Sequence, residues 1–163
     1  MLGDISGLDD YSRIALPLIL GRFPTWGQFA RVHEYAGGDF VEFEVPCPSQ
    51  SVDTGLHVST EDQELTIGFH THHLHFTDYE NRLGERQIHA GLDYAADIVD
   101  ERVGVIAWYG KGQFVGSMSI ELPHVGPLPA FLEGVERLAH LADSFAACER
   151  VTLRSWSGRY DRG

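Results

Sequence analysis

Residues 64–76 read ELTIGFHTHHLHF, and this stretch decides the fold. Leu65, Ile67 and Phe69 alternate with small or polar residues, and such alternation predicts a β-strand with one buried face. The same stretch then runs into four histidines within six residues: His70, His72, His73 and His75. The chain has 9 histidines in all, so nearly half of them gather here. We therefore expect one histidine-rich strand, the fourth strand of the chain, as a central structural element.

Further strands are predicted on both sides of this stretch, at residues 30–35, 40–45, 56–58, 103–109, 113–122 and 151–156. Apolar residues at helical spacing predict two helices, at residues 84–101 and 129–145. The early strands are joined by connections too short for parallel crossovers, so they should pair antiparallel. The prediction is an α+β fold, with a mostly antiparallel sheet of about six or seven strands and two main helices packed on one face.

Residues 1–29 are expected to be irregular, with one or two short helical turns. Asp9 or Asp10 would cap such a turn, because a carboxylate at that position accepts hydrogen bonds from free backbone N–H groups. Pro17 should kink or end it. A chain of 163 residues is long enough for one domain with a core and too short to suggest two. Residues 1–163 are therefore predicted to form a single domain, with residues 1–29 packed on it.

The composition is that of an ordinary globular protein, with 43% hydrophobic and 22% charged residues. The longest apolar run, residues 14–20, contains Pro17 and is too short to span a bilayer. No basic segment precedes it, so it does not resemble a secretory signal. Cys47 and Cys148 lie far apart, which fits buried thiols in a reducing compartment better than a disulfide framework. We expect a cytoplasmic protein.

The formal net charge is −12, from 24 acidic and 12 basic side chains, with Lys111 the single lysine. Binding to nucleic acid requires clustered Lys and Arg, so this class of partner is disfavoured, and anionic membranes are disfavoured for the same reason. An acidic domain instead attracts a basic protein partner. The alternative is that the acidity only keeps the protein soluble.

Metal binding is the first of three roles considered for the histidine cluster. Side chains two apart on a strand point the same way, so His70 and His72, or His73 and His75, can share an ion. The two pairs face opposite sides of a strand, and a catalytic zinc usually has three protein ligands. Each pair would therefore need a third ligand from elsewhere, and the spacing selects none. Candidates for this third ligand are His57, Asp78 and Glu80.

General acid–base catalysis is the second role, with a histidine paired to a carboxylate on a neighbouring strand, such as Glu42 or Glu44. No nucleophile motif and no phosphate-binding glycine loop accompany the histidines. We therefore predict that the chain is not an enzyme and needs no cofactor. The third role is structural: the imidazoles hydrogen-bond to neighbouring groups, apolar residues between them pack inward, and some histidines stay exposed to a partner.

Three segments carry a resemblance to a known family: residues 45–49 (VPCPS), 55–60 (GLHVST) and 64–76. Their order resembles a pattern in small bacterial proteins, in which a proline-containing strand end precedes a hairpin and an H-T-H-F-like ending. Many of those proteins resemble immunity proteins of polymorphic toxin systems, which lie beside toxins delivered by contact-dependent or type VI routes. The resemblance covers roughly residues 43–76 and extends more loosely through the next helix and the strands of Trp108 and Gly116. The sequence departs from the pattern at residues 73–75.

The resemblance implies an inhibitor that binds a cognate toxin and occludes its active site. Toxins that act on nucleic acid present basic clefts, and acidic side chains of the inhibitor would take the place of phosphates. The candidate toxin contacts are Glu42, Glu44, Glu61, Asp62, Glu64, Asp78 and Glu80. One alternative is a metal-binding protein or metal-dependent hydrolase that uses the histidines of residues 70–75. Another is a scaffold or accessory protein with no inhibitory role.

Overall fold

The computed structural model describes residues 5–52, 54–77, 84–122 and 148–163. These residues form eight strands in two antiparallel sheets together with two main helices, so the predicted α+β class is confirmed. The strands are divided between a five-stranded and a three-stranded sheet and do not join in one. The second predicted helix, residues 129–145, lies outside the described residues.

The chain divides into two compact units. The first comprises Met1–Pro46, Thr54–Phe69 and His73–Ala96, and the second comprises Cys47–Asp53, His70–His72 and Asp97–Gly163. The first unit contains most of the five-stranded sheet, and the second contains the three-stranded sheet. The organisation of residues 1–163 as a single domain stays a prediction.

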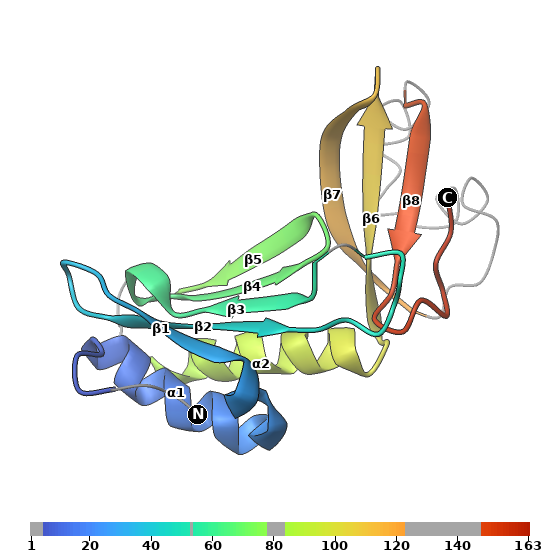
Figure 1. Ribbon diagram of the computed structural model, residues 1–163. Helices are drawn as coiled ribbons and strands as arrows, with labels where there is room; N and C mark the ends of the chain where they lie inside the picture. The colour runs from blue at the N-terminus through green and yellow to red at the C-terminus, as the bar shows by residue number, and fades with distance from the viewer. Residues whose placement is uncertain (1–4, 53, 78–83, 123–147) are drawn as a thin grey trace. The chain divides into compact units, whose positions relative to one another are not determined.

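The five-stranded sheet is a meander in the order β1-β2-β3-β4-β5 (Figure 1). Its strands are β1 (Ala30–His33), β2 (Phe40–Val45), β3 (Leu56–Ser59), β4 (Leu65–Phe69) and β5 (His72–Phe76). The predicted hairpin of residues 30–45 and the short strand near residue 57 are confirmed, and β1 to β4 pair antiparallel in chain order. Short connections between successive strands account for this order.

Residues 64–76 form a hairpin and not a single strand. β4 ends at Phe69, residues 70 and 71 make the turn, and β5 begins at His72. His70 has a φ of 54°, a left-handed conformation in which histidine is enriched relative to most residues. The prediction of one central histidine-rich strand is therefore wrong, because the histidines occupy a turn and the edge strand β5.

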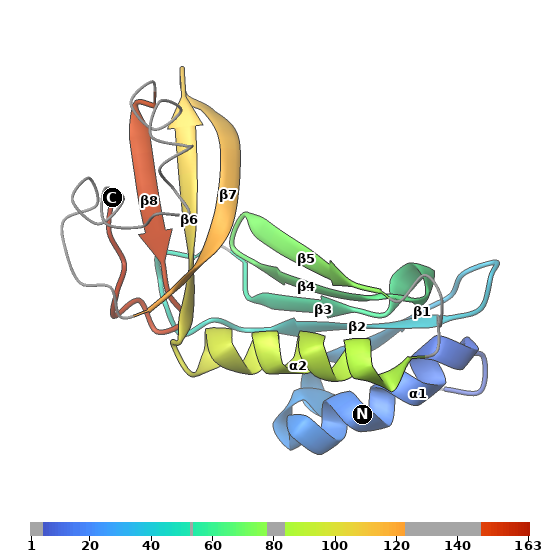
Figure 2. The ribbon, with the colours of Figure 1, turned by 180° about the vertical axis from the view of Figure 1, so that it is seen from behind.

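Helices α1 (Asp10–Arg22) and α2 (Glu85–Val99) lie on the same face of the five-stranded sheet (Figure 2). The side chains buried in this part of the core include Ala15, Leu16, Ile19, Val41, Phe43, Val58, Leu65, Ile67, Phe69, Ile88, Leu92 and Ala95. Gly91 permits a close approach of α2, because a Cβ there would lie 2.6 Å from Leu65 Cδ2 and 3.0 Å from Phe76 Cδ2. The helix pattern predicted for residues 84–101 is confirmed.

The N-terminal segment is more regular than predicted. α1 runs for 13 residues and continues through Pro17, which neither ends nor divides it, and a 3-10 helix, η1 (Pro24–Phe29), follows. A proline inside a helix removes one backbone hydrogen bond, at a cost of about 3 kcal/mol. The buried side chains of Ala15, Leu16 and Ile19 on either side offset that cost by packing.

Asp9 caps α1, as predicted, and its replacement by alanine should destabilise the protein. Its Oδ1 accepts a hydrogen bond of 2.6 Å from the backbone N–H of Ser12, a group with no partner inside the helix. We expect Asp9→Ala to lower the free energy of unfolding by about 1 kcal/mol in urea denaturation. Asp10→Ala is the control, because Asp10 makes only a 3.7 Å exposed ion pair with Arg13 and should change stability by less than about 0.5 kcal/mol. Equal losses in the two variants would contradict the cap.

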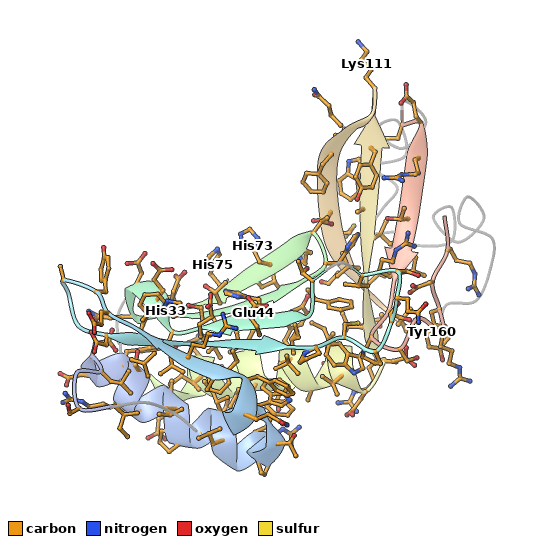
Figure 3. The ribbon with its side chains drawn as sticks, viewed as in Figure 1. His33, Glu44, His73, His75, Lys111 and Tyr160 are labelled. Carbon is orange, nitrogen blue, oxygen red and sulfur yellow. The ribbon has the colours of Figure 1, made fainter. Side chains whose placement is uncertain are left out.

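The three-stranded sheet has the order β7-β6-β8. Its strands are β6 (Val103–Gly110), β7 (Gln113–Glu121) and β8 (Arg150–Arg154), which overlap the predicted regions, although β6 ends one residue later and β8 begins one residue earlier than predicted. Lys111 and Gly112 make the predicted turn between β6 and β7, and Lys111 stands at its tip (Figure 3). A buried cluster centred on Ile106, Trp108 and Leu153 forms the core, with Tyr160 packed against it.

Candidate functional site

The five-stranded sheet has a second face that none of the described helices covers, and we call it the outer face. Alternation along β2 turns Val41, Phe43 and Val45 into the core, so Glu42 and Glu44 point the other way. The antiparallel registers place the matching residues of the other strands beside them. The polar residues of the outer face include Arg31, His33, Glu42, Glu44, His57, Glu64, Thr66, His73 and His75. Figure 3 shows four of them, His33, Glu44, His73 and His75, on the side of the sheet away from the helices.

Two histidines and two glutamates form a connected row across β1, β2 and β3. His57 stands opposite Glu44 in the register, and its Nδ1 lies 2.8 Å from Glu44 Oε1 and 3.6 Å from Glu42 Oε1. The second oxygen of Glu42, Oε2, lies 2.8 Å from His33 Nε2. Each imidazole donates to a carboxylate, and Glu42 uses different oxygens for its two neighbours. The row therefore holds four side chains in fixed orientations on rigid strands.

A second imidazole–carboxylate pair lies on the same face at β4 and β5. His75 Nδ1 forms a short hydrogen bond to Glu64 Oε1, and it also lies 3.0 Å from the hydroxyl of Thr66. His73 packs edge-on against His75, with ring centroids 5.0 Å apart. Glu64 also acts on a buried residue of the core, Tyr11. Burial is the main cause that raises the pKa of Tyr11, and the negative charge of Glu64 raises it further.

The predicted cluster of four histidines does not converge on one point. His73 and His75 share the outer face, whereas alternation turns His72 to the opposite side of β5, where its Nδ1 lies 3.3 Å from Ser117 Oγ. His70 lies in the turn. Among the described residues, the one group of three metal-type ligands whose atoms lie within 4.8 Å of one another is Glu42, Glu44 and His57. From the sequence, His57 is predicted only as a third metal ligand for a histidine pair within residues 70–75.

The predicted toxin contacts fall into three groups. Three acids belong to the outer face: Glu42, Glu44 and Glu64. Glu61 and Asp62 lie in the exposed 3-10 turn η2 (Glu61–Gln63), which joins β3 to β4. Asp78 and Glu80 lie outside the described residues. The binding role of all seven stays a prediction.

His33 is an outer-face residue that the sequence did not suggest. It lies outside the histidine-rich stretch, and only the β1–β2 register brings it beside Glu42. Alternation gives the face of each residue but not its neighbour on the next strand. A hairpin register assigned from the turn at residues 36–39 was the one signal that could have found this pair.

The chain matches no family model, no curated protein and no solved structure. Its functional assignment therefore rests on the chemistry of its own residues. Within the part of the chain that the structure describes, no helix is long and apolar enough to cross a membrane.

Proposed function

We propose that this chain is an immunity-type protein that binds a cognate bacterial toxin and occludes its active site, with the outer face as the binding surface. The observation that carries the proposal is the gathering of carboxylates from β2 and from the residue that precedes β4 on one sheet face that no described helix covers. The resemblance of residues 43–76 to immunity proteins supports the same function. It requires no cofactor and no catalysis by this chain.

Charge favours a basic toxin as the partner. The outer face carries the carboxylates of Glu42, Glu44 and Glu64 beside Arg31, and the whole chain carries a formal net charge of −12. Complementary charge speeds the encounter of two proteins and orients them, and it disfavours acidic partners. A basic active-site cleft that normally holds nucleic acid phosphates meets these requirements. Inhibition in the cytoplasm, where such a toxin would act, is the expected setting.

The histidines contribute by holding the carboxylates in place. Glu42 and Glu44 are both hydrogen-bonded to imidazoles, and Glu64 is bonded to His75. Side chains that are ordered before binding lose less conformational entropy when the partner docks. The pairs thus present fixed acceptors to arginine and lysine side chains of the toxin. A β-sheet supplies the rigid support that such a surface needs.

The test is a binding measurement with the toxin encoded beside this chain. We expect the two proteins to co-purify and the affinity to fall steeply as salt is raised, because exposed charges are screened over about 10 Å at 0.1 M ionic strength. Glu44→Lys should weaken binding by at least about tenfold, since it places a cation against a basic cleft. Glu44 is 45% exposed and is therefore accessible to the partner.

Glu121→Lys is the matched control. Glu121 is an exposed residue on β7, and its replacement changes the net charge by the same amount. Long-range steering should therefore be equal in the two variants, so that any difference in dissociation rate reports on local contact. Equal effects of Glu44→Lys and Glu121→Lys, or an affinity that is indifferent to salt, would rule out the outer face as the binding surface.

A further inference from the structure

We propose that Glu42, Glu44 and His57 form a binding site for a divalent first-row transition-metal ion, for which Zn²⁺ is the natural probe. The ligand atoms of these three residues lie within 4.8 Å of one another. His57 Nδ1 is 2.8 Å from Glu44 Oε1 and 3.6 Å from Glu42 Oε1. The inference rests on this geometry and not on the proposed inhibition of a toxin.

The separations suit a small ion held by nitrogen and oxygen. Zinc lies about 2.0–2.2 Å from imidazole nitrogen and carboxylate oxygen, so neighbouring ligand atoms in a tetrahedral site are about 3–4 Å apart. The observed distance of 3.6 Å falls within that range, and the distance of 2.8 Å lies just below it. An ion bound at His57 Nδ1 takes the place of the proton that this nitrogen donates to Glu44, so the hydrogen bond is lost and rotation of the exposed Glu44 side chain opens the shorter distance. No movement of the strands is required.

Support around the ligands resembles that of established metal sites. Metal-binding groups are usually oriented by a hydrogen bond from a second residue. Glu42 has this support, because His33 Nε2 lies 2.8 Å from Oε2 and leaves Oε1 directed towards His57. Glu44 and His57 are register partners on adjacent strands, so their backbones are fixed relative to each other.

Gly68, the register partner of His57 on β4, adds no side chain beside this group. The ligands are reachable from solvent, with His57 34% and Glu44 45% exposed. Three protein ligands leave a further coordination position for water or for a donor from a partner.

The ligand types select the class of ion. Imidazole together with carboxylate suits Zn²⁺, Mn²⁺, Fe²⁺, Co²⁺ or Ni²⁺, whereas Ca²⁺ and Mg²⁺ prefer all-oxygen sets with more ligands. Glu64 and His75 provide a comparison on the same face. They form an equally close pair, but among the described residues no third ligand completes a set with them. They should not hold an ion with comparable affinity.

The experiment is a calorimetric titration of the full, untagged chain with Zn²⁺, without any partner. We expect one ion per chain and a loss of affinity of tenfold or more in Glu44→Gln and in His57→Ala. His33→Ala should reduce affinity by about tenfold, because it removes the group that orients Glu42. His75→Ala and Glu64→Gln should bind as the unmodified chain does. Circular dichroism of each variant verifies that the fold is kept.

Two results would overturn the site. The first is the absence of saturable Zn²⁺ binding to the unmodified chain. The second is a loss of affinity in His75→Ala equal to that in His57→Ala, which would indicate scattered binding to surface histidines. Glu64→Lys separates this inference from the proposed function. Glu64 belongs to the outer face and lies outside the ligand set, so its replacement should weaken a basic toxin's binding and leave Zn²⁺ binding unchanged.

Discussion

Replacement of Phe43 by alanine is expected to lower the free energy of unfolding by about 3–5 kcal/mol. Phe43 has no exposed surface and lies in the middle of β2, with Ala30 on β1 and Val58 on β3 as its register partners. Alanine buries less apolar surface on folding than phenylalanine does, so less free energy is gained. The substitution also leaves a cavity that the two neighbouring strands and α1 cannot fill. Urea denaturation followed by far-ultraviolet circular dichroism measures the change.

Phe114→Ala is the control for this substitution. Phe114 is 51% exposed on β7 and contacts Tyr109 edge-on at 6.0 Å. Its loss removes one aromatic contact and little buried area, so we expect a change of at most about 1 kcal/mol. A loss in Phe43→Ala no larger than that in Phe114→Ala would contradict the assignment of the core.

The local elements were largely predictable because their signals are local. Alternation along β2 gave both its buried face and its exposed acids, and helical spacing gave α2. Two local predictions were wrong. The turn at His70 has none of the glycine, asparagine or aspartate that marks a tight hairpin, so the alternating pattern predicted one strand that continued across it. Pro17 has an unfavourable local effect that the packing of its neighbours in α1 outweighs.

The division into two sheets and the composition of the outer face could not be predicted in the same way. Both depend on which strands pair and in what register, and these choices are made by contacts far apart in the sequence. Histidines that are adjacent in sequence, such as His72 and His73, separate in space. Residues far apart in sequence, such as Glu44 and His57, come within 2.8 Å. The closest set of potential metal ligands therefore lies outside the histidine-rich stretch.

Gly55→Ala is expected to destabilise the protein by about 3 kcal/mol, at the upper end of the usual range for overpacking. Gly55 immediately precedes β3, next to the last residue of β2. A Cβ at this position would lie 1.9 Å from the carbonyl oxygen of Val45, 2.7 Å from its carbonyl carbon and 3.2 Å from Pro46 Cα. All three are backbone atoms, so no side-chain rotation relieves the overlap and the end of β2 must move. Thermal and urea unfolding both measure the effect.

Gly21→Ala provides a control of the opposite sign. Gly21 lies near the end of α1, and a Cβ there meets no atom within 4 Å. Alanine favours a helix over glycine by up to about 1 kcal/mol, so this variant should be slightly more stable than the unmodified chain. Destabilisation by both substitutions would indicate that loss of a glycine is harmful wherever it occurs, and the contact with Val45 would then not explain the effect.

The contact that a Cβ at position 55 would make with Val45 also connects the stability of the protein to the outer face. The Val45–Leu56 register pair lies next to the pair formed by Glu44 and His57, so a shift of the end of β2 changes the separation of those two side chains. We therefore expect folded Gly55→Ala protein to bind Zn²⁺ more weakly than the unmodified chain, although no ligand has been replaced. Calorimetry below the unfolding transition measures this loss. Unchanged affinity together with lowered stability would show that the chain absorbs the added Cβ without moving Glu44.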